Sequence, residues 1–249
     1  MGFDSGTLVL ICLIFLIAGT IKGTVGIGLP TAAIGLMSQL IDPRAAIALV
    51  IVPSLISNAW QIFRAGDFLG AVRRYWRFLV CLVALILVVS LTITSQVETS
   101  TLVLALGLVI VGFSVMSLAW RPPALHPRHD GAGQVVAGTL AGTLGGLTAI
   151  WAPPMVVYLT ARETEKDEFV RATGVMIFVG TLPLLTGFLS TGMMQVSDIL
   201  VGVLVTIPAL LGFQIGERLR RILDTGRFRV AVLVVFLLLG LNLIRRSFV

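Results

Sequence analysis

Charged residues are scarce in this sequence. They make up 12% of the 249 residues, whereas hydrophobic residues make up 57%. Soluble globular domains typically carry about 25% charged residues and about 45–50% apolar ones. A soluble protein of this size would need far more polar surface. The composition therefore excludes that class and indicates a membrane protein.

Histidine and cysteine are also rare, which bears on catalysis and metal binding. His126 and His129 flank Pro127 in a predicted loop, and the sequence has no His-Glu-x-x-His or Gly-x-Ser-x-Gly motif. Cys12 and Cys81 lie in apolar windows without a nearby base, whereas thiol exchange needs accessible thiols of low pKa. We therefore expect no enzyme, no catalytic residues, no metal site and no cofactor. A membrane thiol–disulfide carrier is the less favoured alternative.

The basic residues do not form a pattern typical of nucleic-acid binding, although the net charge is +6. They are not interleaved with exposed aromatic residues in one patch. They gather in four loops, at 64–77, 121–130, 162–171 and 217–229. The connections at 96–99 and 192–198 carry none. Because basic loops stay in the cytoplasm, we predict that both termini face outward and that no nucleic acid is bound.

Long uncharged windows separate these loops. Several reach the roughly 20 residues that a helix needs to cross about 30 Å of hydrocarbon. We predict an all-α, polytopic helical membrane protein embedded in the lipid bilayer. Its ten helical pieces lie near 6–23, 29–41, 44–62, 75–95, 100–120, 131–147, 152–161, 170–191, 198–216 and 229–244. The pieces at 29–41 and 152–161 are too short to span without tilt, so spanning and re-entry both stay open.

An internal repeat divides the chain. Residues 18–26 read AGTIKGTVG and residues 137–145 read AGTLAGTLG, with six of nine positions identical. Each copy is followed by proline, a short apolar piece and a helix that opens with Arg-Ala. We predict an inverted repeat of two transmembrane halves, 1–120 and 131–249, each with five helical pieces and a broken-helix hairpin. The alternative is that the repeated glycines only let helices pack closely.

The first copy and its trailing residues, Gly23-Thr-Val-Gly-Ile-Gly-Leu-Pro30 after Lys22, resemble the first signature of the sulfite exporter TauE/SafE family of permeases. The second copy, around Gly138–Pro154, resembles that family's second half, although its Trp151 region departs from the commonest glycine run. The resemblance implies a secondary transporter in the bacterial inner membrane. It implies a small anionic substrate such as sulfite, an organosulfonate or a related carboxylate.

The two predicted breaks are where we expect the anion to bind. Broken helices occur at the midplane sites of many transporters, and helix N-termini near Leu29 and Ala152 would offer free N–H groups to an anion. Lys22 is the one full charge inside the first hairpin, and an ionisable residue at membrane depth suggests function. The alternative for Lys22 is snorkelling to the interface. The predicted substrate-binding residues are Lys22, Gly23, Thr24, Gly26, Gly28, Pro30, Asn58, Gln61, Thr143, Gly145, Gly146, Trp151, Pro153 and Arg171.

Several properties stay open at this point. An anion channel is the main alternative to a carrier. A coupling proton or sodium ion is compatible with the sequence, as is a homodimer, but no residue pattern identifies either. The exact anion and the direction of transport are equally unassigned.

Overall fold

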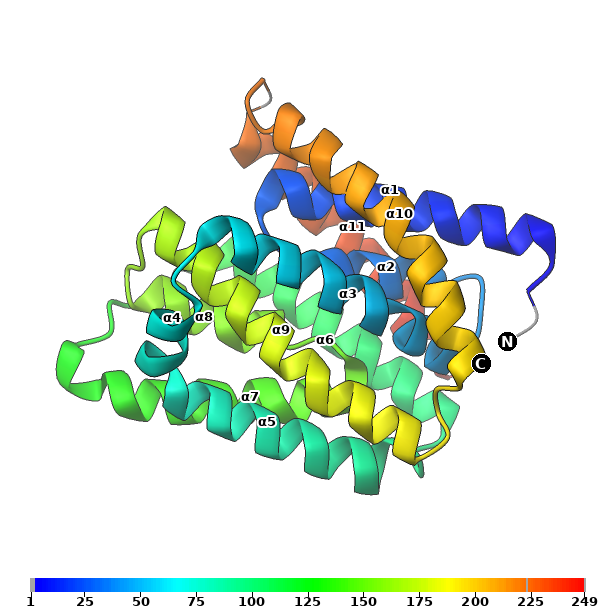
Figure 1. The fold of residues 1–249 in the computed structure, drawn as a ribbon, viewed down its shortest axis with the longest axis horizontal. Helices are drawn as coiled ribbons and strands as arrows, with labels where there is room; N and C mark the ends of the chain where they lie inside the picture. Colours follow the sequence, from blue (N-terminus) through cyan, green and yellow to red (C-terminus); the bar gives the residue numbers. More distant parts are fainter. Residues whose placement is uncertain (1–2, 223, 249) are drawn as a thin grey trace.

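The computed structural model describes residues 3–222 and 224–248, and over these residues the chain folds into helices and loops (Figure 1). The helices are α1 (Ser5–Val25), α2 (Leu29–Met37), α3 (Pro43–Ala65), α4 (Phe68–Arg74), α5 (Trp76–Val89), α6 (Thr99–Ala119), α7 (Asp130–Thr148), α8 (Ala152–Ala161), α9 (Lys166–Ser190), α10 (Val196–Leu219) and α11 (Thr225–Arg246). A π-helical turn, Ser90–Thr94, extends α5, and a 3-10 turn, Pro127–His129, precedes α7.

Seven helices of the described chain are long and apolar enough to cross a membrane, which confirms the predicted all-α membrane fold. They are α1, α3, α5 with its π-helical turn, α6, α9, α10 and α11. The short helices α2 and α8 begin at Leu29 and Ala152, as predicted. Helix α4 was not predicted; it lies in the basic loop after α3.

Local residue chemistry explains many helix boundaries. The side chains of Asp4, Asp42 and Asp224 accept hydrogen bonds from the first-turn amides of α1, α3 and α11, which is the role of an N-cap. Prolines also occur inside three long helices, at Pro53, Pro183 and Pro208. Neighbouring helices make such prolines tolerable within a membrane.

The repeated glycines bring helix backbones into direct contact. A methyl group at Gly19 or Gly23 of α1 would overlap the carbonyl oxygens of Ala209 or Phe213 in α10. Gly212 and Gly216 of α10 stand equally close to the backbone of α1. Small residues at such spacing allow close packing in membranes. The packing role foreseen for these glycines is therefore present.

The second copy of the repeat packs in the same way against a different helix. A methyl group at Gly138 of α7 would lie 2.6 Å from the carbonyl oxygen of Phe78 in α5. At Gly142 it would lie 2.9 Å from the carbonyl oxygen of Leu82. Helix α1 thus pairs with α10, and α7 with α5; α3 pairs with α9, and α6 with α11. Helices from the two parts of the sequence are interleaved around one shared core.

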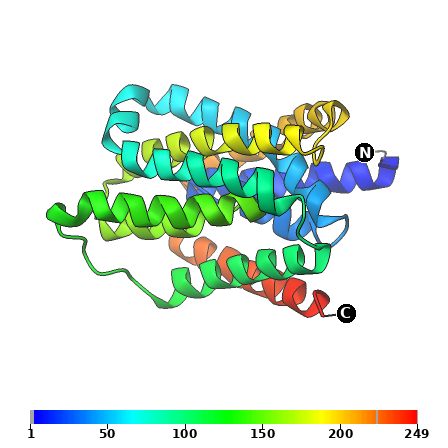
Figure 2. The same cartoon turned by 90° about the horizontal axis from the view of Figure 1, so that it is seen from below.

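The two ends of the molecule differ in charge. Both termini lie at one end, whereas the basic loops around α4, between α6 and α7, between α8 and α9, and between α10 and α11 lie at the other (Figures 1 and 2). We call the second end the basic end. Helix α1 starts at the end with the termini, and α7 starts at the basic end. The two broken hairpins, α1–α2 and α7–α8, therefore enter from opposite ends.

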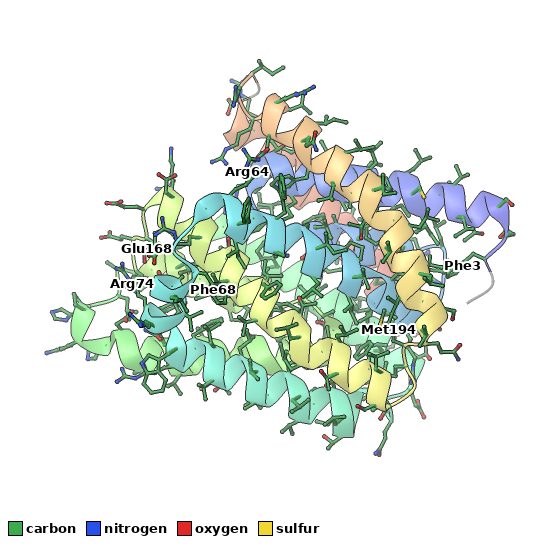
Figure 3. All side chains as sticks on the ribbon, in the orientation of Figure 1. Phe3, Arg64, Phe68, Arg74, Glu168 and Met194 are labelled. Atoms are coloured by element: carbon green, nitrogen blue, oxygen red, sulfur yellow. The ribbon has the colours of Figure 1, made fainter. Side chains whose placement is uncertain are left out.

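Polar contacts tie the loops together at the basic end. Arg74 pairs with Glu168 at 3.0 Å, and both side chains lie beside α4 (Figure 3). Tyr75 donates a hydrogen bond to the same carboxylate, and Tyr158 donates one to Asp130 at 2.7 Å. Burial and the bond to Glu168 raise the pKa of Tyr75 above its ordinary value. Its phenol therefore remains a hydrogen-bond donor at neutral pH.

Candidate functional site

The first break, between α1 and α2, depends on two glycines. Gly26 and Gly28 have φ values of +93° and +103°, a region that glycine enters without the steric cost of a Cβ. The Gly26 N–H donates to the carbonyl oxygen of Lys22 at 2.7 Å and ends α1. No side chain caps α2, because Gly28 is its N-cap residue. The chain therefore reverses direction beside Lys22.

Lys22 lies inside the protein, with a side chain bonded to neutral groups. The residue is 1% exposed. Its Nζ atom donates hydrogen bonds to Ser57 Oγ at 3.0 Å and to Asn58 Oδ1 at 2.8 Å, both on α3. The ring centroid of Phe213 on α10 lies 5.8 Å from Nζ. This burial argues against snorkelling to the interface.

The amide of Asn58 is held in the orientation that serves Lys22. Its Nδ2 atom donates to the carbonyl oxygen of Ser54 at 2.6 Å, which leaves Oδ1 facing the ammonium group. The Ser57 hydroxyl lies 3.4 Å from the same carbonyl. Helix α3 thus presents two neutral oxygen acceptors to Lys22.

No carboxylate forms an ion pair with Lys22 in the described part of the chain. Hydrogen bonds to neutral oxygens satisfy the donors of an ammonium group but leave its charge uncompensated. A charge at membrane depth costs about 2.5–3.5 kcal/mol on insertion scales. An anion beside Nζ would offset that cost, so the geometry suits binding of a negatively charged solute.

A cavity of about 400 Å³ gives access to this lysine from the basic end. It contains four basic residues, Lys22, Arg64, Arg171 and Arg220, and two acidic ones, Asp167 and Glu217, so its formal charge is 4 − 2 = +2. Its other lining residues are Gly23, Gly26, Gln61, Ala65, Val170 and Phe213. A cavity with an excess of one sign of charge attracts counter-ions. This one favours anions.

Two ion pairs border the cavity. Arg64 on α3 pairs with Glu217 on α10 at 2.7 Å, and Arg64 projects at the basic end in Figure 3. Arg171 on α9 pairs with Asp67 at 3.5 Å. Both pairs are partly exposed, so each contributes only modestly to stability. Arg64 and Arg171 therefore lie at the cavity while contributing little to the stability of the fold.

Gln61 bridges α3 and α9 at the cavity wall. Its Nε2 atom donates to the carbonyl oxygen of Val170 at 2.7 Å and lies 3.4 Å from Thr173 Oγ1. Within the described residues, Gln61 Oε1 and Arg171 Nε are buried without a hydrogen-bond partner. Buried polar atoms are nearly always paired. These two are therefore groups that a polar solute or water in the cavity would satisfy.

The second break, between α7 and α8, is closed by apolar side chains. Ala149 has a φ of +56° and Trp151 is 3% exposed. A methyl group at Gly145 would lie 2.6 Å from the indole of Trp151, and Gly180 of α9 also faces that ring. The indole Nε1 is buried without a hydrogen-bond partner in the described chain. Trp151 therefore fills space inside the second break, whereas a polar cavity borders the first.

The structure brings some predicted site residues together and separates others. Lys22, Gly23, Gly26, Gln61 and Arg171 line one cavity, and Asn58 contacts Lys22 behind it. The remaining predicted residues lie elsewhere. Near the first break, the Thr24 hydroxyl donates to the carbonyl oxygens of Thr20 and Gly216, and Gly28 and Pro30 form the start of α2. Near the second break, Gly145 faces Trp151, Gly146 packs against Val89, Pro153 lines an apolar groove, and Thr143 lies on an exposed helix face.

Sequence reasoning missed the contributions of α10 and of Ser57. Phe213, Glu217 and Arg220 all reach the cavity, but they lie about 190 residues after Lys22 in the sequence. The available signal was the glycine spacing shared by α1 and α10, which predicts their pairing only after the helices are placed. Ser57 adjoins Asn58 and could have been included with it.

The described chain contains no cluster of three or more His, Cys, Asp or Glu side chains placed to hold a metal ion. A family model described as sulfite exporter TauE/SafE matches residues 11–243. Comparison with curated proteins found no match. Comparison with solved structures likewise found none.

Proposed function

The chain belongs to the sulfite exporter TauE/SafE family, and on that premise we propose that Lys22 binds the transported anion. The chain is thus a multi-pass membrane permease. The proposed substrate is sulfite, an organosulfonate or a related small carboxylate. The observation that carries the proposal is a buried lysine whose hydrogen-bond partners are neutral and whose cavity has a formal charge of +2.

In the proposed binding mode, the anion sits between Lys22 and the guanidinium of Arg171. The Lys22 ammonium, with three donors, keeps its bonds to α3 and turns the remaining proton toward the cavity. Arg171 supplies the unpartnered Nε at the cavity wall. Guanidinium groups match planar or tetrahedral oxyanions well because their donors are arranged in a fork.

We further propose that the basic end faces the cytoplasm of a bacterial inner membrane, with both termini outside. The positive-inside rule supports this orientation. The cavity then opens to the cytoplasm, where an exporter loads its substrate. The opposite directions of α1 and α7, and the matching pairs α1–α10 and α7–α5, support an inverted repeat built from 1–120 and 131–249.

The closed second break supports a carrier rather than a channel. A channel needs a continuous polar path, whereas Ile150 and Trp151 are both buried at the second break. In a carrier, the path opens to one side at a time around a fixed site. Counterflow with the membrane potential clamped at zero separates the two mechanisms, because only a carrier then lets unlabelled anion inside a vesicle drive accumulation of labelled anion.

The test uses proteoliposomes preloaded with unlabelled sulfite, to which labelled sulfite is added. We expect transient accumulation by the unmodified protein and a roughly 100-fold lower rate for Lys22→Met, the loss that corresponds to about 2.7 kcal/mol of binding. Lys166→Met, at an exposed lysine at the start of α9, is the matched control and should transport normally. Normal counterflow by Lys22→Met, inserted and folded, would refute the role of Lys22.

A further inference from the structure

An apolar groove outside the anion cavity runs between α6 and the α7–α8 hairpin. Its volume is about 710 Å³. Among its described lining residues, Trp120 and Tyr158 supply the only side-chain nitrogen and oxygen atoms. Leu108, Val136 and Leu140 on its rim are 56%, 60% and 53% exposed. The groove therefore opens at the surface of the helix bundle, where a membrane protein meets lipid.

The length of the groove matches one leaflet of a bilayer. Its lining follows α6 from Leu108 to the C-cap residue Trp120, and α7 from Gly133 to Leu144. At 1.5 Å of rise per residue, these stretches are roughly 17 Å long. The hydrocarbon core of a bilayer is about 30 Å thick, so one leaflet is about 15 Å. The groove thus has the length of a single acyl chain that starts at the basic end.

A second, polar cavity of about 850 Å³ continues the groove at the basic end. The two share Met116, Trp120 and Val157. Arg121, after α6, and Arg229, in α11, also line the polar cavity. Neither arginine forms an ion pair within the described residues.

The charge of the polar cavity favours an anionic headgroup. Arg121 and Arg229 contribute two positive charges, and Glu163 contributes one negative charge, so the formal charge is 2 − 1 = +1. Ser117 and Thr160 add hydroxyl groups. Basic pockets between transmembrane helices on the cytoplasmic side bind anionic headgroups, and Trp120 is suited to the headgroup level.

We infer that this paired groove and cavity bind one anionic glycerophospholipid. One acyl chain lies along α6 and α7, and the phosphodiester lies between Arg121 and Arg229. The lipid then fills the space between the α6–α11 pair and the hairpin that carries the second break. This site is separate from the lysine cavity, with which it shares no lining residue.

The test measures lipid retention by the full-length protein in detergent, using native mass spectrometry with phosphatidylglycerol and phosphatidylcholine added at equal concentration. We expect a preference for phosphatidylglycerol that the double variant Arg121→Gln/Arg229→Gln lowers roughly tenfold or more. Arg73→Gln/Arg221→Gln removes the same charge from the same end, outside the groove and its polar cavity, and should keep the preference.

Gly112→Phe tests the acyl-chain part of the site. Gly112 lines the groove, and a Cβ added there would meet no atom within 4 Å. The phenyl ring should occupy the groove and displace both lipids, without destabilising α6, because glycine is a poor helix former. An undiminished phosphatidylglycerol preference in the Arg121→Gln/Arg229→Gln protein would overturn the inference. So would a dimer that Gly112→Phe dissociates, because the groove would then hold a second copy of the chain.

Discussion

The two broken hairpins share a sequence signature but have opposite interiors. At the first break, Lys22 and Gly26, a glycine with positive φ, border a charged cavity. At the second, Ala141 occupies the position equivalent to Lys22, and Trp151 closes the break. The glycines that the copies have in common pack helices together, whereas the residues that differ determine whether polar space forms. The residues that the two copies share therefore indicate how the helices are arranged, and the residues that differ indicate where a polar site can form.

The largest effect that separates the two breaks is expected at Trp151. Trp151→Ala should lower the free energy of unfolding by about 3–5 kcal/mol, because it empties a buried site between Gly145 and Gly180. Denaturation in mixed micelles titrated with SDS measures this change. Trp60→Ala is the control, since Trp60 is 48% exposed, and it should cost far less. Equal losses of stability at both positions would mean that Trp151 is not tightly packed in the second break.

Glycine substitutions sharpen the comparison, because the two breaks need glycine for different reasons. Gly26→Ala should cost about 1–2 kcal/mol through its positive φ alone, since no atom lies within 4 Å of the added methyl. Gly145→Ala should cost about 1–3 kcal/mol through overlap with the Trp151 indole.

A double-mutant cycle distinguishes these two origins. Replacing the indole with a smaller side chain, Trp151→Leu, should recover part of the stability lost in Gly145→Ala and none of that lost in Gly26→Ala, as measured by SDS denaturation. Recovery at both glycines, or at neither, would contradict the proposed origins.

The smallest expected change in stability concerns the ion pair at the mouth of the open break. Glu217→Gln removes the partner of Arg64, whose side chain is 53% exposed. The free energy of unfolding should therefore fall by only about 0.2–1 kcal/mol. The half-saturating sulfite concentration in vesicles should fall several-fold at low salt, because the cavity becomes more positive, and this gain should disappear near 1 M salt. Glu98→Gln, near the opposite end, is the control. A salt-independent gain, or the same gain from Glu98→Gln, would argue against electrostatic attraction.

The sequence was sufficient to predict the positions of both breaks, because glycine and proline act locally. Leu29 and Ala152 begin the short helices as expected. It also made Lys22 a candidate site residue, since a lone charge in an apolar window stands out. The hydroxyl groups were harder to interpret: Thr20, Thr24 and Thr143 each donate to the carbonyl one turn earlier in their own helix. Which side chains meet across helices, such as Phe213 with Lys22, depends on packing that one sequence does not display.

The close contact between α1 and α10 constrains how this protein moves during transport. Gly19 and Gly23 bring the backbone of α1 against that of α10, with no side chains between them to slide or reorient. We therefore expect the two helices to move as one body, with Lys22 and Phe213 moving together. The contacts of this unit with α3 include the bonds of Lys22 to Ser57 and Asn58 and the Arg64–Glu217 ion pair. In the proposed mechanism, the ammonium group would therefore hold α1 against α3 as well as bind the anion.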